Sequence, residues 1–542
     1  MTGRVPGANP SGAVGRHLLA VASAFADRPA VVQGERVVRW REFAADAARL
    51  AAELDRRGIG AGSRVALYYR NCPEYLVALF ALFTLDAVPV NVNYRYRAVE
   101  LAYVLRDCQA AGVIHASELG DVVDEVWSGP RITVDTERGG FDLSATPADV
   151  GPPSEKPADL DEWLLYTGGT TGMPKAVVGS QRERLGVNYG IGLGHIGWPG
   201  EPNPPVDQVA AHQREHGIEP VYFAVAPLMH GTGLYCALIG MTIGATVVLT
   251  ESRSFDAAEI ARVIGARRVT DMHVVGEAML LPLVEVLDEA ERAGTPYDVS
   301  SLRRVQSSGT VWTPRTKRRL LAHADAKLTD MIAATEGGPF ALSVTSRARP
   351  PADDTPFVLV PGARVLRDDG TDVTPGSGEA GVLAAPTAAG AHYLGDPART
   401  AATYRDVDGR RYVAPGDLAT VGTDGTVTLL GRGSSVINTG GEKVYPDEVE
   451  DALRQHPAVR DVTVAGVPHE RFGAVVGAVV VPAAGPDTDA HQLATFVAGR
   501  LSSFKKPRVV VFVPEIRRLA SGKTDLGWVR KQLESRGVEG NV

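Results

Sequence analysis

The chain has 542 residues, of which 44% are hydrophobic and 22% are charged, and its formal net charge at pH 7 is -8. This length exceeds what one hydrophobic core usually serves, so we expect at least two domains. The acidic balance and the lack of any block of Lys or Arg argue against a nucleic-acid-binding surface. The composition is that of an ordinary globular protein.

The cysteines and the apolar stretches limit where the protein is expected to work. Three widely spaced cysteines form neither a disulfide framework nor a zinc-binding spacing, which favours a reducing compartment. Residues 1–12 are rich in Gly and Pro and lack the apolar core of a signal peptide. The longest apolar stretch, Tyr75 to Val90, is too short to span a bilayer. We therefore predict a cytoplasmic protein without membrane insertion.

Up to about residue 150 the chain alternates between strand-like and helix-like segments. Arg36 to Trp40 is strand-like, and Arg41 to Arg57 has apolar residues at helical spacing. A further strand, helix and strand follow at Arg64–Tyr68, Pro73–Leu85 and Val88–Val92. This alternation predicts an α/β fold, with a parallel sheet that carries helices on its faces.

The segment from Thr167 to Lys175 carries the strongest chemical signal. It reads Thr-Gly-Gly-Thr-Thr-Gly-Met-Pro-Lys, follows the apolar strand-like run Trp163–Tyr166 and precedes Ala176–Val178, which favours a second strand. Its glycines let backbone N–H groups surround an anion, the threonine hydroxyls add donors, and Lys175 adds positive charge. It is not a Walker loop, because Pro174 precedes the lysine and no Ser or Thr follows it. The sequence predicts a polyphosphate-binding loop, and a flexible hairpin with a solvated lysine is the alternative.

The alternation of strands and helices continues beyond this loop. Ile191 to Pro220 is rich in Gly and Pro and is predicted to be a surface excursion. Val221–Ala226 and Ala245–Leu249 are predicted strands, and Asp256–Ile264 is a predicted helix. His230 follows the first of these strands, at the carboxyl end where α/β sheets place their sites, although a lone histidine is more often structural.

The loop from Tyr166 to Val177 resembles that of the adenylate-forming superfamily, which contains acyl- and aryl-CoA synthetases, peptide-synthetase adenylation domains and luciferases. Their loop has the form Tyr-Thr-Ser-Gly-Thr-Thr-Gly-x-Pro-Lys-Gly-Val. Gly168 replaces the usual Ser and Ala176 the usual Gly, and both replacements keep the site small. The resemblance covers essentially the whole chain. It implies a large N-terminal domain of stacked sheets with helices, residues 1–431, and a small mobile α+β C-terminal domain, residues 434–542.

The resemblance also implies roles for individual residues of the large domain. The loop residues Thr167, Gly168, Gly169, Thr170, Thr171, Gly172 and Lys175 would bind ATP. His230 would line the pocket of the carboxylate substrate. Ser308 and Gly309, at the end of the predicted strand that begins at Arg304, would lie next to adenine and the acyl group, although small residues also mark ordinary turns.

A Thr-Glu pair matches the next motif of the superfamily, which usually reads Tyr-Gly-x-Thr-Glu. Thr335 would donate to the α-phosphate, and Glu336 would hold Mg2+ as a hard oxygen ligand. Ile332 and Ala333 replace the usual Tyr and Gly. The replacement removes the aromatic ring that relatives place beside adenine, and it hints at an unusual substrate.

The remaining motifs fall near and within the small domain. Asp417 would accept both ribose hydroxyls, although Pro-Gly-Asp is also a common turn, and Arg432 would bind ribose or phosphate. Ser434 falls at the hinge position, which relatives fill with Asp or Lys. Gly440 and Gly441 would face the pantetheine of coenzyme A.

The last motif lies close to the C-terminus. Lys523 matches the catalytic lysine of the superfamily and would bridge the attacking carboxylate and the α-phosphate. The small domain itself is predicted to contain, in order, helix Pro446–Gln455, strands Val459–Ala465 and Ala474–Val481, helix Asp489–Leu501 and strand Val509–Val513.

These motifs together predict a two-step, AMP-forming ligase that uses ATP, Mg2+ and coenzyme A. A small-molecule carboxylate would attack the α-phosphate, and the thiol would then displace AMP from the acyl-adenylate. One alternative is an adenylating ligase with another acceptor, such as an ATP- and nitrite-dependent diazotase acting on an aromatic amine. A non-catalytic AMP-binding module is disfavoured because Lys175, Glu336, Asp417, Arg432 and Lys523 are all present. The oligomeric state is expected to be a monomer or a homodimer.

Overall fold

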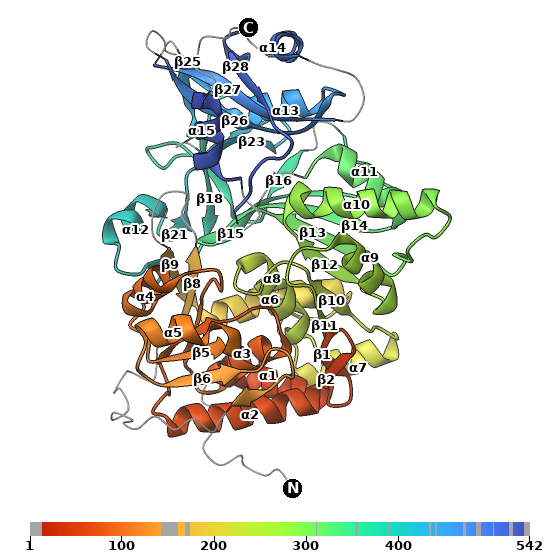
Figure 1. Cartoon of the computed structure of the whole chain (residues 1–542), viewed down its shortest axis with the longest axis vertical. Helices are drawn as coiled ribbons and strands as arrows, with labels where there is room; N and C mark the ends of the chain where they lie inside the picture. Colours follow the sequence, from red (N-terminus) through yellow and green to blue (C-terminus); the bar gives the residue numbers. More distant parts are fainter. Residues whose placement is uncertain are drawn as a thin grey trace. The chain divides into compact units, whose positions relative to one another are not determined.

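A computed structural model gives the fold in two compact units (Figure 1). It describes residues 13–142, 161–167, 174–309, 312–352, 356–387, 390–432, 435–439, 442–469, 473–483, 489–501, 503–519 and 524–535. The first unit groups Met1–Met331, Val344–Asp353 and Ala388–Ala401. The second groups Ile332–Ser343, Asp354–Thr387 and Ala402–Val542. The predicted boundary at residues 431–434 falls inside the second unit and stays a prediction.

The first sheet of the first unit is parallel except at its edge, as the alternation of strands and helices predicted. Its strands lie in the order β2-β1-β11-β10-β12-β13-β14, and only β2 runs antiparallel to its neighbour within this order. Their bounds are β1 Pro29–Gln33, β2 Arg36–Arg39, β10 Val221–Ala224, β11 Thr246–Leu249, β12 Asp271–Val274, β13 Arg304–Ser308 and β14 Lys327–Ala334.

Helices cover both faces of this sheet (Figure 1). On one face, α9 Ala257–Ala266, α10 Gly276–Arg292 and α11 Pro314–His323 bury an apolar cluster with Phe223, Met272 and Val305. On the other face, α6 Gln181–His195 and α8 Gly231–Thr242 pack with β10 through Tyr222. Successive residues of a strand point to opposite faces, which is why Tyr222 and Phe223 belong to different clusters.

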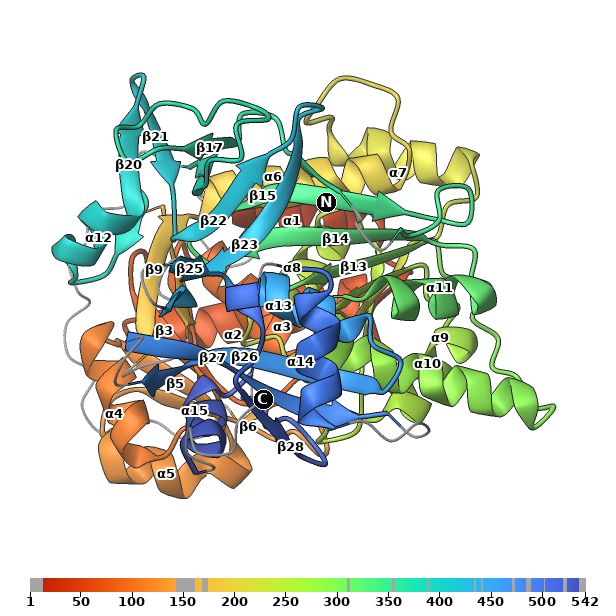
Figure 2. The same cartoon turned by 90° about the horizontal axis from the view of Figure 1, so that it is seen from above.

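The second sheet of the first unit has the strand order β19-β9-β8-β4-β3-β5-β6-β7, and Figure 2 shows its β3, β5 and β6 beside α4 and α5. Its bounds are β3 Arg64–Tyr68, β4 Val88–Asn91, β5 Gly112–Ala116, β6 Arg131–Val134, β7 Phe141–Asp142, β8 Glu162–Thr167, β9 Lys175–Ser180 and β19 His392–Tyr393. The helices are α1 Ala13–Ala24, α2 Trp40–Arg56, α3 Pro73–Thr84, α4 Ala98–Asp107 and α5 Gly120–Val126, with the 3-10 helix η1 Ser117–Leu119. Every residue of α3 is buried, so this helix is a core element.

The second unit contains two groups of paired strands, and the first group is antiparallel throughout. The first has the order β15-β16-β23-β22-β18-β21-β20, with β17 beside β18, and its bounds are β15 Gly337–Thr345, β16 Phe357–Leu359, β17 Arg364–Leu366, β18 Gly381–Pro386, β20 Tyr404–Val407, β21 Arg410–Val413, β22 Asp417–Val421 and β23 Thr426–Arg432. Helix α12 Pro397–Thr403 precedes β20.

The C-terminal part of the second unit confirms the predicted α+β arrangement. Its sheet has the order β25-β24-β27-β26, with β28 parallel to β27. The bounds are β24 Ile437–Thr439, β25 Glu442–Val444, α13 Pro446–Arg454, β26 Val459–His469, β27 Gly473–Pro482, α14 Ala490–Ala498, η3 Ser503–Lys505, β28 Val509–Phe512 and α15 Leu526–Ser535. Each predicted helix and strand of this region has its counterpart.

The prediction of a surface excursion from Ile191 to Pro220 is wrong. Residues 191–195 complete α6, and α7 Val206–Glu215 buries Val206, Val209, Ala210 and Gln213 on one face. These four positions have the spacing of an amphipathic helix, but the flanking Gly and Pro residues obscured it.

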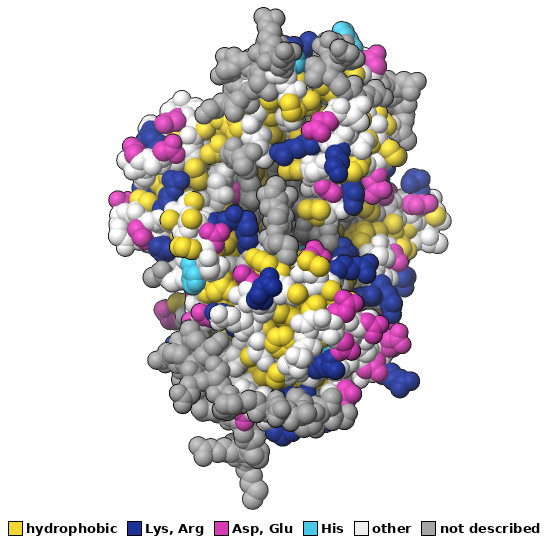
Figure 3. All heavy atoms as spheres, turned by 60° about the vertical axis from the view of Figure 1, so that its left-hand side comes forward, with side chains coloured by type: hydrophobic (Ala, Val, Ile, Leu, Met, Phe, Trp, Pro, Cys, Tyr) yellow, Lys and Arg dark blue, Asp and Glu magenta, His cyan; other side chains and the backbone are white. Residues whose placement is uncertain are grey.

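The expectations about cysteines, membrane spans and surface charge can also be compared with the structure. The three cysteines are free and buried. Within the described residues, no helix combines the length and the apolar character needed to cross a membrane. On the face in Figure 3, Lys and Arg side chains are interspersed with Asp and Glu across the described surface.

The close approach of α8 to the segment that follows β10 gives a stability prediction. A Cβ atom on Gly233 would overlap the carbonyl oxygen of Ala226 and lie 2.6 Å from that of Pro227, whereas one on Gly190 of α6 would meet nothing within 4 Å. We expect Gly233→Ala to lower the free energy of unfolding by about 1–3 kcal/mol. Gly190→Ala, the matched control, should raise it by about 0.5–1 kcal/mol. Denaturant unfolding measures both, and equal effects would contradict the packing described.

Candidate active site

The hairpin of β8 and β9 presents the predicted phosphate loop. The two strands are antiparallel, and Thr167 pairs with Lys175, so the two ends of the loop lie opposite each other. Both residues are half-buried. This confirms the predicted second strand after the loop, where a Walker loop would open a helix. The loop residues Gly168, Gly169, Thr170, Thr171 and Gly172 lie outside the described residues.

Two asparagines, Asn91 at the end of β4 and Asn71 between β3 and α3, hold this region, and the sequence analysis missed both. Buried Asn91, at the end of β4, accepts from the backbone N–H of Tyr166 at 2.8 Å and donates to the carbonyl of Met229. Asn71 accepts from the N–H of Leu228 at 2.7 Å and donates to the carbonyl of Ala226 at 3.3 Å. The entrance to the phosphate loop and the segment before His230 are therefore joined by hydrogen bonds.

His230 lies between β10 and α8, on the carboxyl side of the strand as predicted. It takes the N-cap position of α8 with an extended backbone and is half-buried. Thr232, in the first turn of α8, lies with its hydroxyl 3.3 Å from that of Ser308 at the end of β13. Gly309 follows with a φ of +88°, a conformation that favours glycine. The structure thus brings the N-terminus of α8 to the predicted adenine segment.

The ends of β13 and β14 are braced by polar groups that the sequence did not single out. The Ser307 hydroxyl accepts from the N–H of Gly276 at 3.0 Å, and Glu277 accepts from Thr313 and Thr316 at the start of α11. A buried ion pair joins Lys317 of α11 to Asp330 of β14 at 3.2 Å. Burial raises the pKa of Asp330, and Lys317 offsets this only in part.

Four of the predicted site residues lie in the second unit, and the structure describes the backbone of each. Thr335 and Glu336 follow β14 and are half-buried, and the carbonyl of Glu336 accepts from the hydroxyl of Tyr404 at 3.3 Å. Asp417 begins β22 and pairs with Arg432 at the end of β23. The two residues predicted to contact the ribose are therefore paired on adjacent antiparallel strands.

The remaining predicted residues stay predictions. Ser434, Gly440, Gly441 and Lys523 lie outside the described residues, and Arg432 is described through its backbone.

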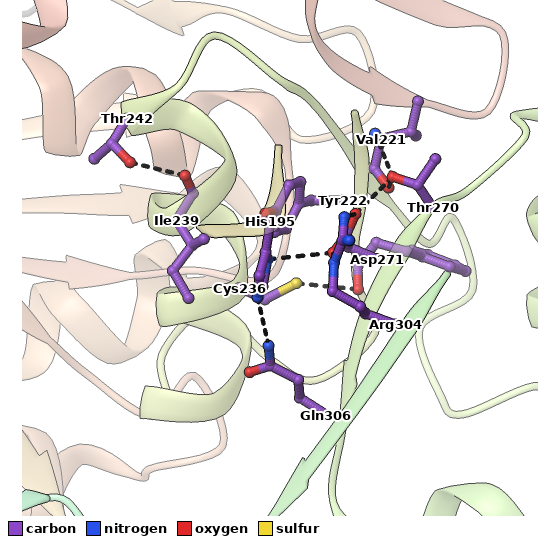
Figure 4. A network of polar contacts seen from close by, with 11 residues as sticks. His195, Val221, Tyr222, Cys236, Ile239, Thr242, Thr270, Asp271, Arg304 and Gln306 are labelled. Atoms are coloured by element: carbon purple, nitrogen blue, oxygen red, sulfur yellow. Dashed lines mark hydrogen bonds and ion pairs between the residues drawn. The ribbon is translucent and has the colours of Figure 1, made fainter. Parts of the chain in front are cut away.

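A buried polar network lies under α6 and α8 (Figure 4). The Nδ1 atom of His195, at the end of α6, lies 2.7 Å from the hydroxyl of Tyr222 and 3.3 Å from Oδ1 of Asp271. Its Nε2 atom is 3.0 Å from the side-chain amide of Gln306. Arg304 forms a two-pronged ion pair with Asp271 at 2.5 and 3.0 Å. Burial alone would raise the pKa of Asp271, but hydrogen bonds from His195 and Arg304 outweigh burial and lower it.

Comparison with known proteins identifies the family. Residues 18–387 match the family model described as AMP-binding enzyme, and residues 448–523 match the model described as AMP-binding enzyme C-terminal domain. The chain belongs to the AMP-binding enzyme family. This confirms the predicted membership of the adenylate-forming superfamily.

Relatives of known activity cover nearly the whole chain. A 3-oxocholest-4-en-26-oate–CoA ligase from Rhodococcus rhodochrous is 36% identical over 531 residues, which are 95% of this chain and 94% of the relative. A medium/long-chain-fatty-acid–CoA/3-oxocholest-4-en-26-oate–CoA ligase from Mycobacterium marinum is 33% identical over 95% of this chain and 96% of its own. As an AMP-binding enzyme with such relatives, the chain is an AMP-forming acyl-CoA ligase, as the motifs predicted.

Solved structures support the fold. The anthranilate CoA ligase AuaEII in complex with anthranoyl-AMP has a TM-score of 0.77 at 21% identity, covering 96% of this chain and 97% of that chain. The amide bond synthetase McbA from Marinactinospora thermotolerans has a TM-score of 0.77 at 22% identity, and the match covers 95% of this chain and 99% of that chain. At these identities the likeness confirms the α/β fold with a smaller C-terminal domain.

One histidine of this AMP-binding enzyme gives a prediction about pH. Burial, helped by the neighbouring His195, lowers the pKa of His273 on β12 from its ordinary 6.5 to about 3. Between pH 6.5 and about 3 the unfolded chain therefore binds a proton that the folded chain does not. This residue should make the free energy of unfolding fall by about 1.4 kcal/mol per pH unit of acidification within that window. His273→Phe should lack this part of the slope in urea titrations, and an unchanged slope would contradict the assignment.

Proposed function

We propose that this enzyme activates an apolar carboxylic acid, either of medium chain length or attached to a fused-ring skeleton, and transfers it to coenzyme A. The observation that carries the proposal is the group of relatives at 33–36% identity that span 95% of the chain and whose names give such acids as substrates. They favour the acyl-CoA synthetase over the diazotase alternative. Three free, buried cysteines fit a reducing cytoplasm, where we propose the enzyme works.

In this proposal, the chain's own residues bind and neutralise the nucleotide. Lys175 and Thr167, opposite each other at the ends of the hairpin, contact the phosphates. Asp417 accepts hydrogen bonds from the ribose hydroxyls, beside Arg432. Transfer at phosphorus needs mainly positioning and charge neutralisation, so no protein nucleophile is required.

Magnesium fits the residues present. Mg2+ is commonly held by one or two carboxylates together with substrate phosphates and water, so the carboxylate of Glu336 is a sufficient protein ligand. When bound, the ion neutralises charge on the phosphates. Tyr404 fixes the backbone of Glu336 by its hydrogen bond to the carbonyl, and Thr335 beside it donates to the α-phosphate.

The acyl side of the site is assigned to His230 and Ser308. His230 contacts the carboxylate of the acid, and Ser308 with Gly309 gives the adenine ring and the acyl group room to approach β13. Thr232 connects the two positions through its contact with Ser308 at 3.3 Å. After adenylate formation, the small domain turns about Ser434, withdraws Lys523 and brings Gly440 and Gly441 to the thiol.

A second acceptor has one observation in its favour. The fatty acid–[acyl-carrier-protein] ligase ScoC from Streptomyces coeruleorubidus is 30% identical over 94% of this chain and 93% of its own. A carrier protein presents the same pantetheine thiol as coenzyme A. The acceptor therefore has to be tested separately from the adenylation step.

The catalytic role of Lys523 is tested by Lys523→Ala. We expect pyrophosphate release to fall by about a hundredfold or more, because the charge that stabilises the reacting carboxylate and α-phosphate is lost. Thioester formation from a supplied acyl-adenylate should be retained far better, since that step does not need this charge. Lys531→Ala on α15 is the control and should retain both activities. Normal pyrophosphate release by Lys523→Ala would rule out the assignment.

The acceptor is tested with wild-type enzyme and Gly441→Trp, by mass spectrometry of the products formed with coenzyme A or with a pantetheinylated carrier protein. An indole side chain would block the approach of pantetheine. We expect Gly441→Trp to release pyrophosphate at a rate within about threefold of the wild type and to form little thioester. If the wild-type enzyme acylates only the carrier protein, the carrier protein is the acceptor and coenzyme A is not. Absence of both products from every acid would contradict the proposed function.

A further inference from the structure

The residue pair Tyr166–Ala176 lies next to the predicted phosphate loop. Tyr166 of β8 is the register partner of Ala176 of β9, and the next pair toward the loop is Thr167 with Lys175. Asn91 bonds both backbone groups of Tyr166, since it accepts from the N–H at 2.8 Å and donates to the carbonyl at 3.4 Å. These bonds run between neighbouring strands, so they hold β8 within the plane of its sheet.

Successive side chains of β8 point to opposite faces of this sheet. Tyr166 belongs to the apolar cluster formed with α4, whereas its neighbour Leu165 belongs to the cluster formed with α3 and α8. By this alternation Thr167 points away from α4, and Lys175, its partner across the two strands, shares its face. A rotation of β8 about its own axis would therefore move the side chains of Tyr166 and Thr167 in opposite directions.

One side-chain hydrogen bond restrains this rotation. The hydroxyl of Tyr166, which is only 6% exposed, donates to Oδ2 of Asp107 at 2.5 Å. Asp107 is the last residue of α4, the helix beside the β8–β9 hairpin (Figure 1). Burial raises the pKa of Tyr166, and Cys108 and Asp107 raise it further, so the hydroxyl stays protonated and remains a donor. The bond leaves the face of the sheet and thus fixes what the bonds of Asn91 leave free.

Asp107 occupies a position that the energetics of a helix disfavour. The C-terminal end of a helix carries partial negative charge, so an anionic side chain in the last turn lowers stability. Arg106 agrees with this rule, and Asp107 breaks it. Residues that break a local preference are expected where a function requires them. The partner of Asp107, Tyr166, indicates that the requirement comes from the phosphate-loop hairpin.

We propose that Asp107 is a positioning residue for nucleotide binding, whose bond to Tyr166 sets the rotation of β8 and so directs Thr167 and Lys175 toward the phosphates of ATP. Asp107 acts through Tyr166 and not by contact with ATP. The inference rests on the proposed function, because it assumes that Thr167 and Lys175 contact the phosphates. The attraction between a lysine and a phosphate depends on their separation, so a small rotation of the strand weakens binding.

The test measures the affinity for MgATP by calorimetry, without acid or acceptor. Tyr166→Phe keeps the ring and removes the donor, and Asp107→Ala removes the acceptor. Each should weaken MgATP binding by about tenfold, and the double variant should bind no more weakly than either single variant. Loss of the negative charge of Asp107 by itself would strengthen the binding of an anion, so weaker binding reports the lost hydrogen bond.

Two further variants separate positioning from general stability. Asp107→Asn keeps an acceptor oxygen and should bind MgATP within about threefold of the wild type. Tyr68→Phe is the matched control, because Tyr68 is buried in the same apolar cluster and its hydroxyl donates to the carbonyl of Tyr96 at 2.7 Å. Tyr68→Phe should lower the unfolding temperature as Tyr166→Phe does, but it should keep the wild-type affinity for MgATP.

In assays of pyrophosphate release, the KM for ATP should rise in Tyr166→Phe and Asp107→Ala, whereas the KM for the acid should stay at the wild-type value. If Asp107→Ala does not fold, Tyr166→Phe decides the question, since it removes a single oxygen atom.

Three results would overturn the inference. The first is MgATP affinity within about twofold of the wild type in Tyr166→Phe. The second is an equal loss of affinity in Tyr68→Phe, and the third is an equal loss in Asp107→Asn and Asp107→Ala. In all three cases the proposed function would stand, because the wild-type enzyme binds MgATP. If the wild-type enzyme does not bind MgATP, the proposed function and the inference fail together.

Discussion

The alternation of side chains along three parallel strands is the constraint on which the first unit depends. Phe223 of β10, Met272 of β12 and Val305 of β13 join the apolar core beneath α9, α10 and α11. The residues before them on the three strands, Tyr222, Asp271 and Arg304, lie side by side on the opposite face of the sheet. A shift of one residue in any of these strands would exchange the two faces, so the register is strongly fixed. The fixed register places Ser308 at the carboxyl end of β13, with its hydroxyl near that of Thr232.

The buried ion pair of Asp271 and Arg304 is a second consequence of this register. The two residues are direct neighbours on adjacent strands, which allows both oxygens of the carboxylate to be bonded. His195, the last residue of α6, also contacts Asp271. Helix α6 begins directly after β9, the strand that follows the predicted phosphate loop. The end of α6 and the strands β12 and β13 are thus linked through one buried carboxylate.

Local features could be predicted from the sequence, and long-range features could not. The strand after the phosphate loop and the helices and strands of the C-terminal part followed from apolar spacing, and the structure confirms them. Helix α7 was missed because Gly and Pro on its flanks outweighed its spacing. Gln306, one partner of His195, lies 111 residues away, and Met229, one partner of Asn91, lies 138 residues away, and no local pattern encodes such a contact. An asparagine that ends an apolar strand, as Asn91 does, is a signal that could have drawn attention to the site.

Asn91 also limits how this enzyme can change during evolution. One side chain satisfies the backbone before the phosphate loop and the backbone before His230. A change that moves the segment before His230 must therefore displace or break a hydrogen bond of the same residue that holds the backbone before the predicted phosphate loop. Under the proposed function, this asparagine couples substrate range to nucleotide affinity. Under the same proposal, new specificities are more readily acquired at positions that leave this asparagine undisturbed.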